Sequence, residues 1–180
     1  GVTLHPVPVS GIGRAMRTMS FARNVEAALA EETYDIIQGV GKTWTHNVYQ
    51  PHGGVHAATV EANLAMRSKA GAAIKRLSAS ISPKECVFRR IERRQFVERP
   101  AELFVALSRM VRRDMQRFYN VPDDRITVVY NGIDTERFNP ELRAERRAAL
   151  RFEWGIAPDD VVFLIVAHNW RLKGVHELVR

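Results

Sequence analysis

Hydrophobic positions along this 180-residue chain follow two different spacings. Where apolar residues recur three or four positions apart, or a helix-start signal precedes them, the pattern predicts α-helices. These fall over residues 14–32, 60–77, 82–96, 109–119, 139–154 and, at the end of the chain, 175–180. Short apolar runs bounded by turn residues predict strands over residues 34–39, 47–50, 102–107, 125–130 and 161–167, with residues 2–9 as a strand end that runs into a loop.

The alternation of helices and strands predicts the fold class. Several of the strands are unbroken apolar runs, which is typical of parallel sheets with helices over both faces. We therefore expect an α/β protein of the doubly wound type. In such sheets ligands bind at the carboxyl ends of the strands, so the candidate site positions are the loops at His52, Ser108, Asn131 and residues 168–173.

Local signals predict several helix ends. Ser82 can cap the helix that follows it, and Glu85 can complete a capping box with that serine. Ser108 can cap the helix over residues 109–119. Gly155 can terminate the helix before it, because glycine adopts the left-handed conformation that such ends require.

Composition narrows the class of protein. Hydrophobic residues make up 46% of the chain and charged residues 26%, which is typical of a globular protein and excludes general disorder. The single cysteine, Cys86, excludes a disulfide within the chain and fits a reducing compartment. No apolar run reaches the ~20 residues that a membrane-spanning helix needs. The length fits one domain, or a domain and a piece of another. Because the sequence does not start with Met and its last residues fall inside a helical pattern, we expect a fragment.

Charge is concentrated in the middle of the chain. The formal net charge is +7, and residues 67–117 hold nine more basic than acidic residues. Such a cluster indicates a polyanionic partner, which can be nucleic acid, an anionic lipid surface or a phosphorylated substrate. The alternative is a set of solvated helix faces without a partner.

Two apparent motifs fail on their spacing. Residues 39–43 (Gly-Val-Gly-Lys-Thr) resemble the end of a Walker phosphate-binding loop, but Ile36 stands where its first glycine belongs and no helix is expected after Thr43. His52 and His56 are four positions apart, but two glycines separate them, so no zinc site is predicted. His52 is still a candidate site residue because it follows a strand. The alternative is a loop histidine with a structural role only.

Basic residues also precede the last predicted helix. Lys173 follows Arg171 by two positions, and two cations beside a helix N-terminus can together hold a diphosphate. Basic residues are common in loops, so this pattern alone does not identify a site.

Three longer stretches carry a family resemblance. Residues 104–140, FVALSRMVRRDMQRFYNVPDDRITVVYNGIDTERFNP, resemble the middle of a family 4 glycosyltransferase of the GT-B fold. The following RAALRFEWGIAPDDVVFLIVAHNWRLKGVHELV is similar to that family's entry into its second domain. Upstream, YDIIQGVGKTWTHNVYQPHGGVHAA resembles the branch that contains the lipopolysaccharide core glucosyltransferases. The resemblance covers essentially the whole chain.

This resemblance implies two Rossmann-like domains that face each other across a cleft. Residues 1–134 would be most of the acceptor-side domain, residues 135–158 the interdomain linker and helix, and residues 159–180 the truncated start of the nucleotide-sugar-binding domain. The family transfers a hexose from a nucleotide-sugar donor to a glycolipid, lipopolysaccharide-like or other glycan acceptor, with retention of the anomeric configuration. No metal and no separate cofactor are expected.

The resemblance also implies roles for particular residues. His52 fits the first-domain histidine at the junction of acceptor and donor, and would be catalytic. Lys173 matches the lysine that contacts the donor diphosphate, while Arg171 stands in for the family's arginine. Three further residues match positions that face the cleft or pass between the domains: Ser108, Asn131 and Gly132. No pair of carboxylates stands out as the acid and base of a glycosidase.

Two parts of the family pattern are absent from the chain, namely the first strand with its glycine-rich loop and the paired-glutamate motif. We therefore expect the chain by itself to be inactive. A non-catalytic GT-B remnant and a basic nucleic-acid- or anion-binding module stay open as alternatives. The pattern matches no helix-turn-helix, zinc-finger or RNP signature, which argues against nucleic acid. The resemblance favours a cytoplasmic protein, peripheral at the inner face of an anionic membrane.

Overall fold

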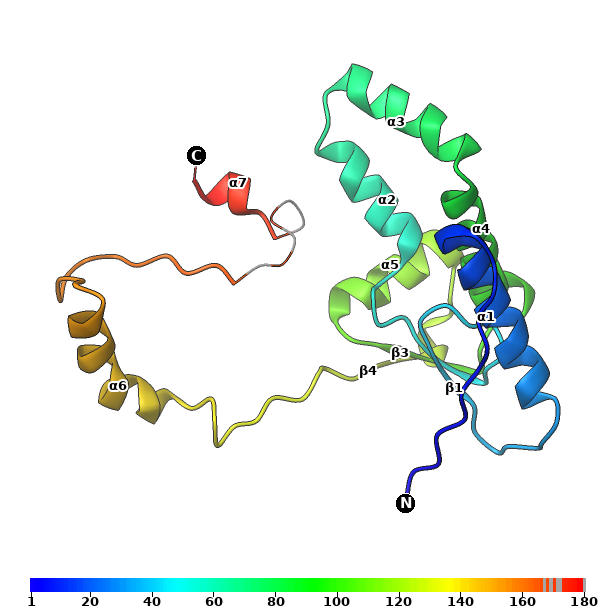
Figure 1. The fold of residues 1–180 in the computed structure, drawn as a ribbon, viewed down its shortest axis with the longest axis horizontal. Helices are drawn as coiled ribbons and strands as arrows, with labels where there is room; N and C mark the ends of the chain where they lie inside the picture. The colour runs from blue at the N-terminus through cyan, green and yellow to red at the C-terminus, as the bar shows by residue number, and fades with distance from the viewer. Residues whose placement is uncertain (167, 169, 171–172, 180) are drawn as a thin grey trace. The chain divides into compact units, whose positions relative to one another are not determined.

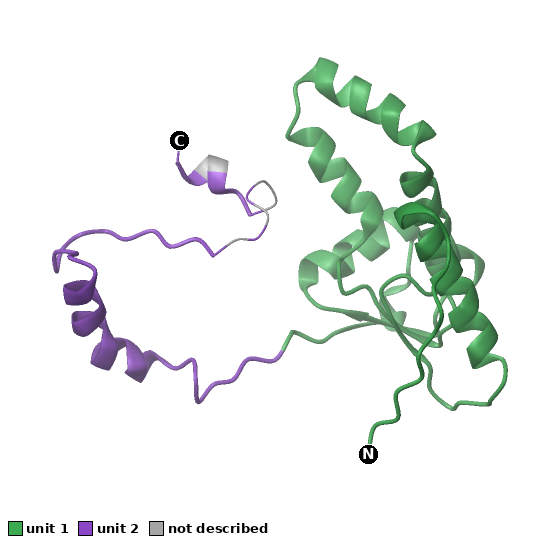
Figure 2. Cartoon of the chain, viewed as in Figure 1, with its two compact units in different colours: residues 1–131 green, residues 132–180 purple. Residues whose placement is uncertain are grey.

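The computed structural model describes residues 1–166, 168, 170 and 173–179. The chain divides into two compact units, unit 1 (Gly1–Asn131) and unit 2 (Gly132–Arg180), which Figure 2 shows in two colours. Each unit is described by itself. The domain boundaries expected from the sequence concern the arrangement of a larger protein and stay a prediction.

Unit 1 contains a four-stranded parallel sheet. Its strands lie in the order of the sequence and are β1 (Gln38–Val40), β2 (Val48–Gln50), β3 (Leu103–Ala106) and β4 (Ile126–Val128). The expected α/β class with a parallel sheet is confirmed. The strands are shorter than predicted, but each lies inside its predicted segment or extends one residue beyond it.

One face of this sheet is buried. The register places Gly39, Tyr49, Phe104 and Ile126 in one row across all four strands, and all four residues are buried. Alternate residues of a strand point to opposite faces, and their neighbours along the strands are exposed or half-buried, apart from Ala106 on the buried face. In the part of unit 1 that the structure describes, the second face of the sheet is therefore less buried than the first.

Helices of unit 1 build the core together with the buried face of the sheet (Figure 1). They are α1 (Gly13–Leu29), α2 (His56–Ala65), α3 (Lys69–Ile81), α4 (Pro83–Arg93), the π-helical turn η1 (Arg94–Glu98), α5 (Arg109–Tyr119) and the 3-10 turn η2 (Asp123–Arg125). Phe96 of η1 and Met115 of α5 pack with Tyr49 and Phe104 in the main core cluster. A smaller cluster joins Trp44 to Ala22 of α1 and Ile91 of α4.

The single helix predicted over residues 60–77 is two helices. α2 ends at Ala65, and α3 begins at Lys69 after Ser68 accepts a hydrogen bond from the Gly71 amide at 3.2 Å. Ser68 offers a competing N-cap in the middle of the predicted segment, and serine favours caps over helix interiors because its hydroxyl bonds the backbone. After this break, α3 packs mainly against its neighbours α2 and α4.

The predicted capping box at Ser82 forms only in part. The Ser82 hydroxyl accepts from the Glu85 amide at 3.5 Å, as predicted. The Glu85 carboxylate instead pairs with Nε2 of His56 at 2.9 Å, and this contact links α4 to the start of α2. A tertiary partner, which the local pattern could not reveal, has replaced the local one.

Residues 2–9 do not form the predicted strand end. Val2 and Leu4 are almost fully exposed, and the segment is tied to α1 through Asn24, whose amide donates to the Pro8 carbonyl at 2.8 Å. Pro6 and Pro8 have no N–H to donate to a neighbouring strand, which disfavours strand pairing here.

Unit 2 contains α6 (Pro140–Glu153) and α7 (Val175–Leu178). Gly155 follows α6 with φ +65°, as its predicted role as a terminator requires. Residues 161–166 do not form the predicted strand, and Val161, Val166 and their neighbours are largely exposed. A strand needs a neighbour for its backbone groups, and the described part of unit 2 offers none; Ala167 lies outside the described residues. Within the residues described, no helix is long and apolar enough to cross a membrane.

Candidate functional site at the strand ends

The parallel strands of unit 1 bring four loops to one edge of the sheet. Lys42, His52, Ser108 and Tyr130 each lie two residues beyond the end of their strand. Because neighbouring strands are paired in register, the loops after β1 and β2 are adjacent, as are those after β2 and β3. The structure thus gathers the predicted positions His52 and Ser108 at one edge, and adds Lys42 to them.

Buried side chains hold the loop that carries Lys42 through hydrogen bonds to its backbone. The Gln95 amide, 1% exposed, donates to the carbonyls of Gly41 at 2.7 Å and Thr43 at 2.5 Å. The Tyr49 hydroxyl donates to the same Gly41 carbonyl at 3.1 Å. Three hydrogen bonds to the residues on either side of Lys42 fix the backbone from which its side chain extends. No helix follows Thr43, so the rejection of the Walker motif is confirmed.

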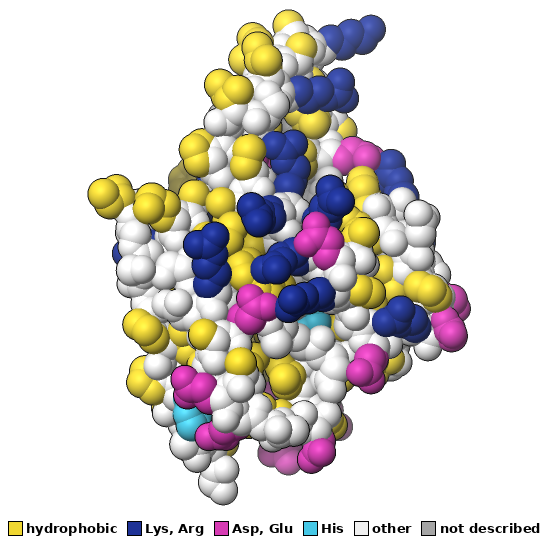
Figure 3. Space-filling view, turned by 90° about the vertical axis from the view of Figure 1, so that its right-hand side faces the viewer, with side chains coloured by type: hydrophobic (Ala, Val, Ile, Leu, Met, Phe, Trp, Pro, Cys, Tyr) yellow, Lys and Arg dark blue, Asp and Glu magenta, His cyan; other side chains and the backbone are white. Residues whose placement is uncertain are grey.

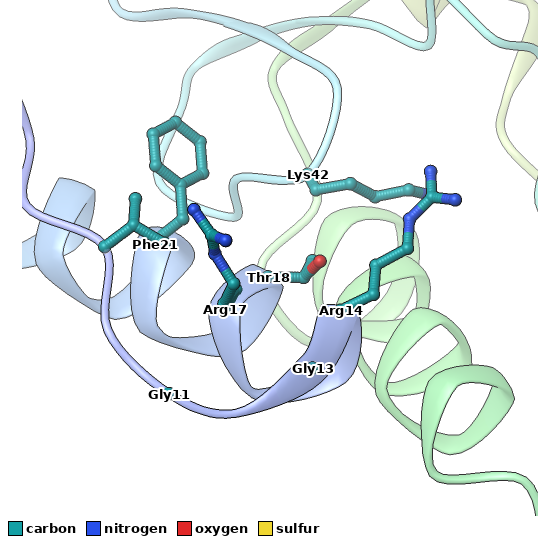
Figure 4. Close-up of a pocket in the computed structure, with 8 residues that line it drawn as sticks. Gly11, Gly13, Arg14, Arg17, Thr18, Phe21 and Lys42 are labelled. Atoms are coloured by element: carbon teal, nitrogen blue, oxygen red, sulfur yellow. The ribbon is translucent and has the colours of Figure 1, made fainter.

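Lys42 lines a pocket of about 570 Å³ together with the start of α1. The other cations that line it are Arg14 and Arg17, and no lining residue is acidic. Figure 4 shows the Lys42 and Arg14 side chains reaching toward the same point, with the Thr18 hydroxyl between the elements that carry them. Gly11 and Gly13, both with positive φ, form the rim of the pocket.

The backbone conformation at position 11 requires glycine. Its φ is +110°, and a Cβ built there would lie 2.7 Å from the Cβ of Met16. Only glycine adopts this conformation without strain and without that clash. The tight turn lets the chain enter α1 close to the pocket, and Ile12 at the N-cap supplies no side-chain hydrogen bond to the first amides of the helix.

Cations also gather around one aromatic ring beside the pocket. Lys42 Nζ lies 4.6 Å from the centroid of Phe88, Arg14 Cζ 5.9 Å and Lys84 Nζ 5.5 Å. A ring face attracts cations through its quadrupole. Burial lowers the pKa of Lys42, and the neighbouring Arg14 charge lowers it further, while Glu92 and Glu85 oppose the shift.

The two carboxylates near Lys42 are engaged elsewhere. Glu85 pairs with His56, as described above. Glu92, 3% exposed, accepts from the backbone amides of His56 and Ala57 and from the Tyr119 hydroxyl at 2.7 Å. Glu92 therefore caps the N-terminus of α2 from another helix, where the helix dipole favours a negative charge. Neither carboxylate forms an ion pair with Lys42.

His52 lies in a tight turn after β2. The Gly54 amide closes this turn on the Pro51 carbonyl at 2.8 Å, and Gly54 has φ +73°. The His52 ring is exposed, and none of the side-chain hydrogen bonds among the described residues involves it. The structure therefore gives His52 no structural partner, and its catalytic role stays a prediction.

His46 lies in the loop between β1 and β2 that also carries Lys42, and its ring is packed against neighbouring residues. Its ring stacks on Tyr49 with centroids 4.6 Å apart, and burial lowers its pKa to about 4. A Cβ at Gly39 would lie 2.6 Å from its Nδ1 atom, so the ring fills the space that this glycine leaves. His46 is neutral near pH 7 and serves the packing of β1 against β2.

The remaining predicted positions are placed as follows. The Ser108 hydroxyl accepts from the Val111 amide at 3.2 Å, so its capping role is confirmed, while a role in the cleft stays a prediction. Asn131 and Gly132 are exposed at the boundary of the two units. In unit 2, Lys173 is exposed in a turn before α7, and Arg171 lies outside the described residues. The described residues hold no group of three His, Cys, Asp or Glu that could bind a metal.

Sequence reasoning missed the three cations of the pocket. Lys42 was set aside with the Walker motif, and Arg14 and Arg17 lie outside the basic region 67–117. The available signal was the glycine pair at 11 and 13 before a helix with basic residues in its first turns. That signal alone does not reveal that Lys42 reaches the same place.

The parallel α/β fold of unit 1 is that of a domain of the GT-B class, and comparisons with known proteins agree. The model of the family Glycosyltransferase Family 4 matches residues 1–137, and the chain belongs to this family. The structure matches the crystal structure of WaaG, described as a glycosyltransferase involved in lipopolysaccharide biosynthesis, with a TM-score of 0.71 and 21% identity. That match covers 96% of this chain and 44% of the WaaG chain, and the likeness is one of fold.

Two curated relatives match shorter stretches. An uncharacterized glycosyltransferase of Methanocaldococcus jannaschii is 28% identical over 76 residues, which is 42% of this chain and 20% of the relative. A probable transglycosylase of Burkholderia thailandensis is 41% identical over 58 residues, which is 32% of this chain and 15% of the relative. The chain thus spans a fifth or less of the curated relatives it matches.

Proposed function

We propose that the full-length protein is a retaining glycosyltransferase that moves a hexose from a nucleotide-sugar to a glycolipid, lipopolysaccharide-like or other glycan acceptor. The observation that carries this proposal is the family match over residues 1–137, together with a parallel sheet whose carboxyl edge gathers Lys42, His52 and Ser108. The involvement of WaaG in lipopolysaccharide biosynthesis supports a lipopolysaccharide-like acceptor.

The chemistry of the proposed reaction needs cations at the donor. As the glycosidic bond to the nucleoside diphosphate breaks, negative charge develops on the leaving oxygen. Lys173 would stabilise that charge, with Arg171 beside it in sequence, and fixed cations can do so without a metal ion. Asn131 and Gly132 would form the passage between the domains that closes donor and acceptor together.

His52 would act at the reacting sugar. Its exposed ring has no partner among the described residues, so both nitrogens are available to a substrate hydroxyl or to the reacting centre. The adjacent glycines leave room for a ligand to approach the backbone. Ser108 would face the same cleft with the hydroxyl that also caps α5.

We further propose that unit 1 binds the inner face of an anionic membrane through α3. Ile74, Leu77 and Ile81 lie at helical spacing and are each at least 70% exposed, beside Lys75 and Arg76. Figure 3 shows basic side chains gathered on one face of the molecule, and hydrophobic side chains exposed at the top of the same view. Apolar residues beside cations are typical of helices that lie in a membrane interface.

A vesicle experiment tests the membrane proposal. The full-length protein should bind vesicles that contain anionic lipid at least about tenfold more tightly than neutral vesicles, since each basic residue near the surface contributes ~1 kcal/mol. Leu77→Ser should weaken that binding, while Leu150→Ser in α6 should not. Equal binding to both kinds of vesicle would overturn the proposal.

A transfer assay tests the function itself. The full-length protein is incubated with a panel of nucleotide-sugars and a lipopolysaccharide core acceptor, and the product is analysed by mass spectrometry and proton NMR. One donor should yield a product with a new glycosidic bond of the same anomeric configuration as the donor. Inversion of the anomeric configuration would contradict the retaining reaction. The absence of transfer from every donor would contradict the enzymatic function and support a non-catalytic member of the family.

A further inference from the structure

The pocket at the start of α1 concentrates positive charge without neutralising it. Arg14 and Arg17 come from the first turns of α1, while Lys42 reaches the pocket from the loop after β1. None of the three forms an ion pair with the residues that the structure describes. Elsewhere in unit 1 many arginines are paired: Arg93, Arg94, Arg99, Arg112 and Arg117.

Unpaired cations that share a pocket repel one another. Arg14 and Lys42 both approach Phe88, and the charge of Arg14 disfavours the charged form of Lys42. The carboxylates that could neutralise them are held by other donors, because Glu92 caps α2 and Glu85 pairs with His56. A bound anion would relieve this repulsion, and a cationic ligand or a metal ion would increase it.

The shape and polar groups of the pocket suit a phosphate. Guanidinium groups donate in a fork that matches phosphate oxygens, while lysine adds a point charge. The Thr18 hydroxyl and the uncapped amides behind Gly13 are further donors at the same place. A volume of about 570 Å³ also leaves room for the sugar to which a phosphate would be attached.

We propose that Arg14, Arg17 and Lys42 form a binding site for a phosphate group of one of the substrates. This inference rests on the proposed glycosyltransferase function for the identity of the ligand, but the site itself does not depend on catalysis. The phosphate could belong to a phosphorylated glycan acceptor or to the nucleotide-sugar donor. Gln95 is the positioning residue, since its amide holds the backbone on both sides of Lys42.

Isothermal titration of the full-length protein with inorganic phosphate, at constant ionic strength, tests the site. Wild-type protein should bind phosphate saturably, and the double variant Arg14→Met/Lys42→Met should bind about tenfold or more weakly. Lys84→Met is the matched control, because Lys84 also lies over Phe88 but does not line the pocket. This control should change the affinity less than about twofold. No saturable binding by wild-type protein, or an equal loss in Lys84→Met, would overturn the proposal.

A second arm distinguishes the two sources of the phosphate. If phosphate binds with the same affinity in the presence of saturating nucleoside diphosphate, the pocket takes the phosphate of the acceptor. If the nucleoside diphosphate displaces phosphate and itself binds Lys42→Met more weakly, the pocket takes the phosphate of the donor. Transfer without phosphate binding would overturn this inference alone, whereas phosphate binding without transfer would overturn the proposed function alone.

The positioning role of Gln95 has its own test. Gln95→Met should lower phosphate affinity about threefold when Lys42 is present and should have no effect in the Lys42→Met background. A merely structural loss would lower affinity equally in both backgrounds, and that result would overturn the positioning role. Circular dichroism of each variant checks that the fold is kept.

Discussion

Two lysines that follow predicted strands differ in how the molecule holds them. Lys42 of unit 1 is half-buried, lies over Phe88 and extends from a loop whose carbonyls are fixed by Gln95 and Tyr49. Lys173 of unit 2 is exposed, in a turn that precedes the four-residue helix α7. The family resemblance selects Lys173, whereas the structure selects Lys42.

The difference teaches what each kind of evidence can detect. A resemblance finds a residue by its place in a sequence pattern, whatever surrounds it. A structure finds a residue by its neighbours, and Lys42 is half-buried over Phe88 and extends from a hydrogen-bonded loop before any ligand arrives. Preorganisation of this kind increases affinity because less entropy is lost on binding. We therefore expect Lys42 to lose less entropy on binding its ligand than the exposed Lys173 does.

The largest effect is expected at His52, next to Lys42 along the sheet edge. If the proposed function holds, His52→Ala in the full-length protein should lower turnover about hundredfold, which is the lower end for loss of a group that acts on a proton or the reacting centre. Donor affinity should stay within about twofold, because unit 2 would hold the donor. The matched control is His5→Ala, since His5 is also exposed. An equal loss of donor affinity and turnover would contradict the assignment of catalysis to unit 1 and donor binding to unit 2.

Next in size is the loss of the support beneath Lys42. Gln95→Met leaves the Gly41 and Thr43 carbonyls short of a buried donor and should lower the free energy of unfolding by about 2 kcal/mol. Gln116→Met is the control, because Gln116 bonds Asp123 on the exposed surface and should cost less than ~0.5 kcal/mol. Urea denaturation of the chain measures both. Equal changes would mean that the Lys42 loop is no better supported than the surface.

A smaller effect is expected at Lys173. Lys173→Ala in the full-length protein should weaken nucleoside-diphosphate binding about tenfold, equivalent to ~1.4 kcal/mol. The free energy of unfolding should hardly change, because the side chain is exposed. Titration with nucleoside diphosphate and urea denaturation measure the two quantities. Unchanged turnover and affinity would show that the resemblance assigned the wrong lysine.

The smallest effect is a gain of stability at Lys42. Burial lowers the pKa of its amine, so below that pKa the folded state carries the cost of a half-buried charge. At neutral pH the free energy of unfolding of the Lys42→Met variant should therefore be up to about 1 kcal/mol higher than that of the wild-type protein. The gain should shrink as pH rises through the lowered pKa, because the folded wild-type protein then loses the proton first. A loss of stability at neutral pH, measured against Lys84→Met, would contradict this account.

Local features of the fold could be predicted from the sequence. Ser108 caps α5 as predicted because the hydroxyl and the Val111 amide are three residues apart. The α/β alternation predicted the parallel sheet for the same reason, since each strand and helix carries its own pattern. The break at Ser68 was missed because two signals overlap there, a continuing apolar stripe and an N-cap.

Features that depend on distant contacts could not be predicted. Gln95 bonds the loop of Lys42 from more than fifty residues away, and Glu92 caps α2 from α4. No local pattern in the chain shows that these residues meet.

The most direct test of the site around Lys42 is crystallographic. Crystals of the full-length protein, soaked in selenate as a phosphate analogue, are measured at the selenium absorption edge. The account predicts an anomalous peak about 4 Å from Lys42 Nζ, which places selenate oxygens about 3 Å from that nitrogen and within hydrogen-bonding distance of the Arg14 guanidinium. The absence of a peak there, with Arg14 or Lys42 instead paired to a carboxylate of the protein, would contradict the account.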